Sequence, residues 1–206
     1  MTIAHPIRRS KAFTLPNVLT YARLAAVPVV VALLFWPRDD WARWPALAIF
    51  IVAGVTDYFD GYFARVYAQQ SALGRMLDPI ADKLLVAACL LMLVADETIY
   101  GWSLLAAIVI LCREILVSGL REYLAGLKVS VPVSRVAKWK TALQLVAIGF
   151  LIAGPAGDRL LGSGNEIGLA TEIGLVLLWV AAILTLYTGW DYLKAGIRHI
   201  SDEDGI

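Results

Sequence analysis

The sequence predicts an all-α, polytopic membrane protein with six transmembrane helices, on two observations. The 206 residues are 60% hydrophobic and have a mean hydropathy of +0.72, which is more apolar than an ordinary soluble domain. The apolar residues gather in six runs of about 17–23 residues, the length that a helix needs to cross about 30 Å of hydrocarbon. No repeat or polar linker divides the chain, so we expect residues 1–206 to form a single membrane domain.

The six predicted spans follow one another with short polar connections. In order, they cover about residues 18–36, 45–65, 73–95, 101–124, 138–154 and 168–190. Pro37 ends the first span and Pro155 the fifth, because proline cannot continue a helix, and charged or glycine-rich stretches bound the others. Residues 1–16 are basic and predict either a helix on the membrane surface or a disordered tail. Residues 191–206 form a polar tail.

The distribution of basic residues predicts the orientation of these spans. With six crossings, both termini lie on one side of the membrane. Of the 18 Lys and Arg residues, only Arg38, Arg43 and Arg159 fall on the other side. The positive-inside rule therefore places the termini in the cytoplasm, and we expect a multi-pass protein of the cytoplasmic membrane. The net charge of +1 gives no indication of a nucleic-acid partner.

Four aspartates lie at the edges of the second and third spans. Asp57 and Asp60 are three residues apart, and Asp78 and Asp82 are four apart, so each pair projects from one helix face. Carboxylates so close together in a membrane protein repel one another unless a cation holds them. Oxygen ligands favour Mg²⁺ or Mn²⁺, as one or two ions. The alternative is pairing with a basic side chain, such as Asp78 with Arg75.

The residues around these aspartates suit a phosphate-bearing ligand. Gly61, Ala64 and Gly74 are small enough to let a ligand approach the backbone, and Arg65 is a planar donor suited to phosphate. The alternatives are helix packing for the glycines and contact with lipid headgroups for Arg65. Carboxylates, a metal, an arginine and small residues together favour phosphoryl transfer.

The complete pattern D-x2-D-G-x2-A-R-x8-G-x3-D-x3-D, from Asp57 to Asp82, resembles the signature of the CDP-alcohol phosphotransferases, integral membrane enzymes of phospholipid synthesis. The resemblance implies two metal ions held by the four aspartates, with Asp82 also acting as the catalytic base. It implies a homodimer. It also implies that the CDP part of the lipid donor contacts Asn17, Thr20, Gly61, Ala64, Arg65, Ser71 and Gly74. For Asn17, Thr20 and Ser71, a role in starting a helix is the alternative.

A basic cluster lies between the fourth and fifth spans: Arg113, Arg121, Arg135, Lys138 and Lys140. By its charge alone, it is either a topology signal that contacts anionic lipid or an anion pocket. The stretches REILVSGLREYLA and VPVSRVAKWKTALQ resemble the phosphatidylglycerophosphate synthase branch of the same family, with Ala137 where that branch has glycine. This resemblance implies that the cluster binds the phosphate of glycerol 3-phosphate and that the donor is CDP-diacylglycerol.

Two alternative functions remain open on the sequence. The same chemistry could act on inositol phosphate, serine or phosphatidylglycerol. A cation or proton-coupled transporter could use the aspartates as an ion path. The two cysteines, Cys89 and Cys112, lie inside apolar segments, and we expect buried thiols rather than a disulfide.

Overall fold

A computed structural model of the chain describes residues 15–36, 40–67, 72–127, 135–162 and 168–204. In these residues the protein is all-helical and contains no strand, so the all-α part of the predicted fold class is confirmed. Its helices are α1 (Leu15–Phe35), α2 (Asp40–Tyr67), α3 (Ala72–Ala95), α4 (Ser103–Gly126), α5 (Arg135–Leu160) and α6 (Leu169–Asp204). Four of them, α1, α4, α5 and α6, are long and apolar enough to cross a membrane, as expected for a multi-pass membrane protein. The predicted surface helix in residues 1–16 lies almost wholly outside the described residues.

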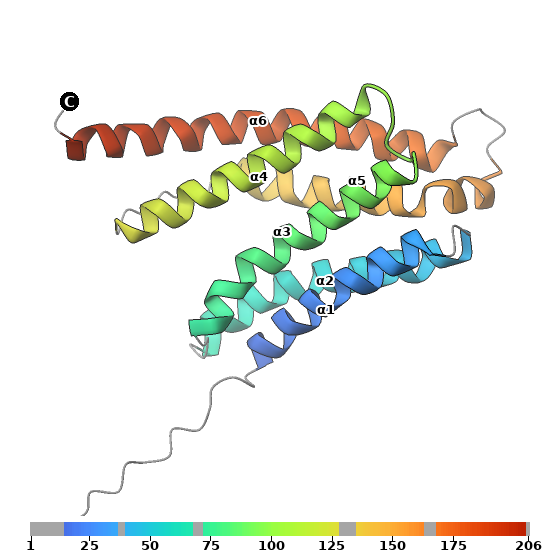
Figure 1. Cartoon of the computed structure of the whole chain (residues 1–206), viewed down its shortest axis with the longest axis horizontal. Helices are drawn as coiled ribbons and strands as arrows, with labels where there is room; N and C mark the ends of the chain where they lie inside the picture. The colour runs from blue at the N-terminus through green and yellow to red at the C-terminus, as the bar shows by residue number, and fades with distance from the viewer. Residues whose placement is uncertain (1–14, 37–39, 68–71, 128–134, 163–167, 205–206) are drawn as a thin grey trace, which may run out of the picture.

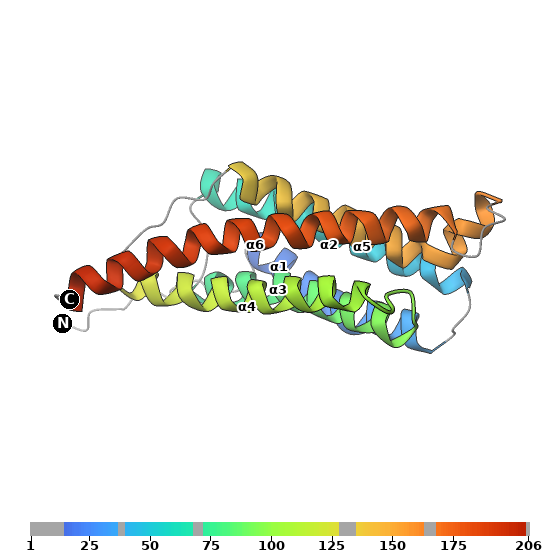
Figure 2. The same ribbon diagram turned by 90° about the horizontal axis from the view of Figure 1, so that it is seen from above.

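Successive helices run back and forth along the molecule (Figure 1). As a result, the start of α1, the end of α2, the start of α3 and the end of α4 all point toward one end, together with the start of α5 and the end of α6. Seen from above, α6, α5 and α2 follow one another on one side of the bundle, and α4 and α3 lie on the other (Figure 2). This arrangement gathers predicted site residues of five helices, α1 to α5, toward one end of the bundle.

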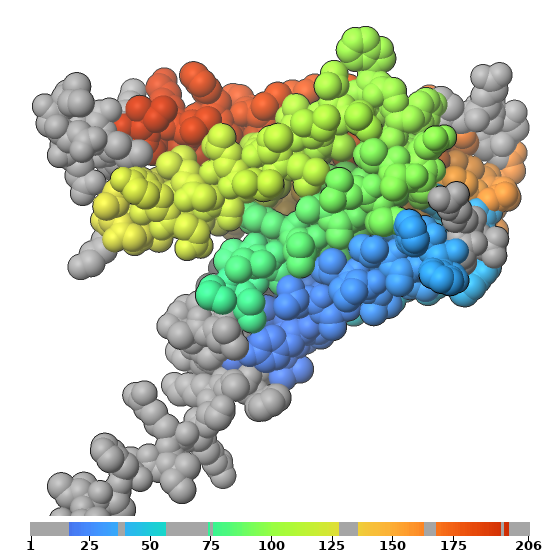
Figure 3. Space-filling model, viewed as in Figure 1, coloured from blue at the N-terminus to red at the C-terminus, as the bar shows by residue number. Residues whose placement is uncertain are grey.

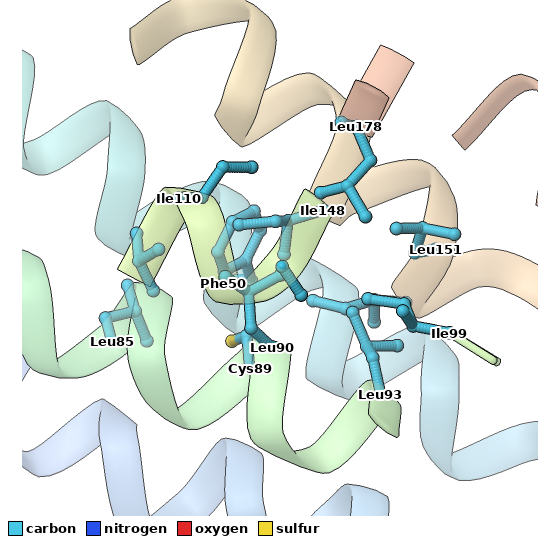
Figure 4. Packing of buried hydrophobic residues seen from close by; sticks show 14 of the residues in the cluster. Phe50, Leu85, Cys89, Leu90, Leu93, Ile99, Ile110, Ile148, Leu151 and Leu178 are labelled. Atoms are coloured by element: carbon cyan, nitrogen blue, oxygen red, sulfur yellow. The ribbon is translucent and has the colours of Figure 1, made fainter. Parts of the chain in front are cut away.

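The centre of the bundle is a continuous apolar core (Figure 4). Side chains from all six described helices meet there, including Val30 of α1, Phe50 of α2, Leu90 of α3, Ile110 of α4, Ile148 of α5 and Leu178 of α6. Many large apolar side chains instead face outward, as expected for a surface that contacts lipid.

The fifth span was predicted to stop at Gly154-Pro155, and the regular helix does break there, but a second helical segment that was not predicted follows it. The chain kinks at Gly154, where φ is 30° and ψ is −121°, and the helix then resumes to Leu160. Pro155 stands at the start of the resumed helix, where a missing N–H costs little. The extension also carries Asp158, whose Oδ1 accepts hydrogen bonds from the backbone N–H groups that begin α6.

Arg43 of α2 stabilises the chain at this kink. The carbonyl of Leu151 lies four residues before Pro155, so Pro155 has no N–H to donate to it. Arg43 Nη1 donates to this carbonyl at 3.4 Å and to the carbonyl of Ile152 at 3.3 Å. Arg43 Nη2 donates to Asp96 Oδ2 at 2.5 Å. One guanidinium therefore joins α2, the α3–α4 connection and α5 at the end of the bundle opposite the predicted site.

Two further expectations need correction. Both cysteines are free, as predicted, but only Cys89 is buried, whereas Cys112 is exposed on the outer face of α4. Residues 191–206 were predicted to be a polar tail after a span ending near 190, but α6 continues as helix to Asp204. Polar residues end an apolar run without ending a helix, so the composition alone could not locate this end.

Candidate active site

A cavity of about 810 Å³ opens between α3, α4 and α5, with contributions from α2 and α6. In the space-filling view, the surface is hollowed between the first half of α3 and the second half of α4 (Figure 3). The charged residues that line the cavity are Asp82, Lys83, Arg113, Glu114, Arg121, Glu122, Lys138 and Lys140. Four of the five residues predicted to bind the acceptor phosphate therefore converge on one cavity with the predicted base, Asp82.

The α3 wall carries the second aspartate pair. Asp82 lines the cavity, and its Oδ2 lies 4.0 Å from Lys83 Nζ. Asp78, one helical turn earlier, accepts a hydrogen bond at its Oδ1 from the hydroxyl of Thr20 on α1. Asn17, a turn before Thr20, is buried on the same helix. The structure thus joins a predicted metal ligand to a residue predicted to contact the nucleotide.

The first aspartate pair of the motif lies on α2, the helix whose Gly54 contributes to the cavity. Gly54 lines the cavity, and Asp57 and Asp60 follow it by three and six residues on the same continuous helix. A rise of about 1.5 Å per residue keeps both within about two helical turns of the cavity wall. Gly74 is buried at the start of α3. The described part of the chain does not include Ser71. It includes only the helical backbone, without side chains, of Asp57, Asp60, Gly61, Ala64 and Arg65.

Three charged side chains form a buried network where α4 meets α5 and α6. Lys140 of α5 donates a hydrogen bond to Glu114 Oε1 on α4, and Arg113 Nη1 donates to the same oxygen at 3.1 Å. The rest of the Arg113 guanidinium binds α6. Its Nε donates to the carbonyl of Thr185 at 3.1 Å, and its Nη2 donates to the hydroxyl of Thr188 at 3.0 Å. Arg113 and Lys140 are therefore held in defined positions before any substrate binds.

Arg121 and Lys138, the two other residues predicted to bind the acceptor phosphate that line the cavity, differ in their contacts within the protein. Arg121 Nη2 lies 3.3 Å from the hydroxyl of Tyr192 on α6, and its guanidinium carbon lies 5.7 Å from the centre of the Tyr192 ring. Lys138 is exposed at the cavity and forms no ion pair with any described residue. Arg135 is the fifth residue predicted to bind the acceptor phosphate, and its side chain lies outside the described part of the chain.

Lys83 and Tyr192 line the cavity and were not among the predicted site residues. For Lys83 the sequence held a signal, since it directly follows Asp82. For Tyr192 it held none, because the residue falls in a stretch that was interpreted as a polar tail.

A second, apolar groove of about 580 Å³ runs between α2 and α5. It shares Gly54, Ala142 and Leu145 with the polar cavity, so the two adjoin at these residues. Gly149 helps to form it, and a Cβ added there would lie 3.6 Å from Leu47 Cδ1. An apolar groove therefore adjoins the polar cavity and follows α2 and α5 toward the other end of the bundle.

The donor groups at the α3 wall fit a hard divalent cation. Asp78 and Asp82 supply carboxylate oxygens from one face of α3. Among the described side chains, no three His, Cys, Asp or Glu residues converge on a metal-sized site, but Asp57 and Asp60 lie outside that comparison. The predicted four-carboxylate site thus stays a prediction, half of whose ligands the structure places.

The fold and the cavity define a helical membrane protein with a charged cavity beside an apolar groove. The chain belongs to the CDP-alcohol phosphatidyltransferase family, whose sequence profile matches residues 13–187. The resemblance inferred from the aspartate motif is therefore confirmed.

Three relatives illustrate the similarity, and each is named CDP-diacylglycerol–glycerol-3-phosphate 3-phosphatidyltransferase. The protein from Cereibacter sphaeroides is 38% identical over 93% of this chain and 99% of its own. The protein from Rickettsia bellii is 45% identical over 88% of this chain and 94% of its own. The protein from Shigella flexneri is 38% identical over 93% of this chain and 99% of its own.

Proposed function

We propose that this protein transfers a phosphatidyl group from CDP-diacylglycerol to sn-glycerol 3-phosphate, giving phosphatidylglycerophosphate and CMP. The observation that carries the proposal is the cavity in which Asp82 and a cluster of arginines and lysines line one space. The names of relatives that are 38% and 45% identical over nearly their whole length support it.

The charge of the cavity supports a phosphate-bearing acceptor. Five basic residues and three acidic ones line it, which leaves an excess of positive charge. A phosphate monoester carries about −1.5 to −2 charges at neutral pH, so it complements this cavity better than serine or an uncharged alcohol does. Inositol phosphate has the same complementarity, and the names of the relatives favour glycerol 3-phosphate over it.

In the proposed reaction, the Asp82 carboxylate accepts the proton of the acceptor hydroxyl as its oxygen attacks the β-phosphorus of the donor. The bond from this phosphorus to the oxygen of CMP breaks, and CMP leaves. Asp57, Asp60, Asp78 and Asp82 would hold Mg²⁺ or Mn²⁺, as two ions. When bound, these ions neutralise charge on the donor's phosphates.

The chain's own residues would orient both substrates. Arg113, Arg121, Lys138, Lys140 and Arg135 would bind the acceptor phosphate. Asn17, Thr20, Gly61, Ala64, Arg65, Ser71 and Gly74 would surround the CDP moiety. The apolar groove between α2 and α5 would take an acyl chain of the donor, because it adjoins the cavity.

The membrane arrangement is part of the proposal. All six helices would cross the cytoplasmic membrane, with both termini and the cavity on the cytoplasmic side, where most basic residues lie. Glycerol 3-phosphate would then reach the cavity from water and the donor from the bilayer. The working unit would be a homodimer, as the family resemblance implies.

The test is CMP release by the purified protein in detergent with CDP-diacylglycerol and Mg²⁺. Each reaction contains one acceptor: glycerol 3-phosphate, serine, inositol, inositol phosphate or phosphatidylglycerol. We expect CMP release only in the reaction that contains glycerol 3-phosphate as the acceptor. Release with another acceptor would reassign the basic cluster, and folded protein inactive with every acceptor would overturn the proposal.

A further inference from the structure

Glu114 occupies an unexpected place for a carboxylate. It lines a cavity that, on the function proposed above, binds an anion, so its charge opposes the substrate. Yet its Oε1 accepts hydrogen bonds from both Lys140 and Arg113. A carboxylate at this position weakens anion binding by repulsion, so its presence needs an explanation. The two hydrogen bonds to Lys140 and Arg113 provide one.

Lys140 is the side chain that depends most on Glu114. The side chain of Lys140 is only 3% exposed, and Glu114 is the one acceptor that the structure provides for its ammonium among the described residues. A lysine side chain has several freely rotating bonds, and ordering it costs up to about 2 kcal/mol. Glu114 therefore determines where the ammonium lies in the cavity wall.

Arg113 is anchored from two directions. Its Nε and Nη2 are bound by Thr185 and Thr188 of α6, which leaves the Nη1 edge for Glu114. Gly189 leaves room for the Arg113 side chain to reach α6, since a Cβ at Gly189 would lie 3.0 Å from Arg113 Cγ. The Glu114 carboxylate accepts a hydrogen bond from this edge and another from Lys140 of α5. These contacts join α4, α5 and α6 at the cavity.

We propose that Glu114 is a positioning residue that fixes Lys140 and Arg113 in the geometry required to bind the acceptor phosphate. One carboxylate neutralises only one of the two cations, so the group retains a net positive charge for the substrate. The inference rests on the proposed function, because it concerns the acceptor site of that reaction.

Two physical effects of Glu114 predict opposite changes in acceptor affinity. If its charge only repelled the substrate, Glu114→Gln would leave Lys140 and Arg113 more attractive to phosphate, and KM for glycerol 3-phosphate would fall. If Glu114 positions them, the same variant releases Lys140, and KM rises. We expect a rise of about tenfold, the scale of one charge-assisted hydrogen bond, with kcat changed far less.

Two further variants separate position from charge. Glu114→Asp keeps the charge but withdraws the carboxylate by one methylene, so we expect its KM to rise as well, while a pure charge effect leaves it unchanged. Glu122→Gln removes a carboxylate that lines the same cavity and has no ion-pair partner among the described residues. Its KM should stay constant or fall slightly.

The measurement is the initial rate of CMP release against glycerol 3-phosphate concentration, with KM for CDP-diacylglycerol as the internal control. Thermal unfolding shows which variants are folded. If Glu114→Gln does not fold because two buried cations lose their partner, Glu114→Asp makes the same comparison with the charge retained.

A double variant tests whether Glu114 acts through Lys140. On the Lys140→Met background, Glu114→Gln should raise KM by much less than it does alone, because the ammonium it positions is absent. An unchanged or lower KM for Glu114→Gln and Glu114→Asp, in a wild-type protein active with glycerol 3-phosphate, overturns the inference alone. A wild-type protein inactive with glycerol 3-phosphate overturns the proposed function instead.

Discussion

Replacement of Arg43 by methionine tests how the bundle is held together at the end far from the cavity. The change keeps most of the side-chain volume but removes the guanidinium that binds Asp96, the hydroxyl of Thr98 and the carbonyls of Leu151 and Ile152. The Leu151 carbonyl then has neither Arg43 nor an N–H from Pro155 to donate to it, and Asp96 loses its cation.

The expected loss follows from the burial of these groups. Removal of one partner from a buried ion pair costs about 3–5 kcal/mol, while exposed pairs contribute about 0–1 kcal/mol. The side chains of Arg43 and Asp96 are 12% and 17% exposed, so water still reaches them, and we take the lower part of the buried range. We expect the free energy of unfolding to fall by about 3 kcal/mol, or the unfolding midpoint by about 6–12 °C for a chain of this size.

The assay is thermal unfolding of purified protein in one detergent, followed by circular dichroism. Arg159→Met is the matched control, because Arg159 also pairs with an aspartate, Asp40, at the same end but is 69% exposed. The control should shift the midpoint by no more than about 4 °C. Asp96→Asn should fall between the two, since Arg43 keeps its carbonyl contacts.

Equal shifts for Arg43→Met and Arg159→Met would refute the reasoning, because they would show that the Arg43 contacts contribute no more than a surface ion pair. A folded Arg43→Met protein should also keep its KM for glycerol 3-phosphate, since Arg43 lies near the start of α2 and this helix starts at the end of the bundle opposite the cavity (Figure 1).

Three other predictions concern the proposed reaction. Asp82→Asn should abolish CMP release while nucleotide binding persists, and substantial turnover would remove Asp82 as the base. Arg65→Ala should weaken CMP binding by about tenfold or more, the scale of a charge-assisted contact to phosphate, as measured by competition with CDP-diacylglycerol; unchanged affinity would remove Arg65 from the nucleotide site. EDTA should stop CMP release, and Mg²⁺ or Mn²⁺ should restore it. Activity that survives complete metal removal would contradict the four-aspartate site.

Much of this architecture could be predicted because membrane spans have a strong compositional signal. The fourth span, expected at about 101–124, corresponds to α4 at Ser103–Gly126, one of the four described helices that are long and apolar enough to cross a membrane. The convergence of Arg113 with Lys140 followed from a resemblance to known stretches of sequence. The structure explains it, since α4 and α5 both direct these residues toward the end where Asp82 lies.

The errors have a common physical origin in contacts that a linear sequence does not show. Pro155 carries the same local signal whether a helix stops or kinks, and the outcome here involves Arg43, more than a hundred residues away in sequence. The exposure of Cys112 could not be inferred, because in a membrane protein the core and the lipid-facing surface are both apolar. Tyr192 was missed because a polar composition hid a continuing helix.

The two ends of the bundle use ionic side chains in different proportions, and on the proposed function this difference would explain why one end binds substrate. At the far end, Arg43 is matched by Asp96 and by two carbonyls, so its charge and donors are committed within the protein. At the cavity, Glu114 is shared by Arg113 and Lys140, so the group retains a positive charge. In a low-dielectric setting such an excess is costly until an anion enters. A bound phosphate would therefore stabilise the cavity end of the bundle, and glycerol 3-phosphate should raise the unfolding midpoint of the wild-type protein more than that of Lys140→Met.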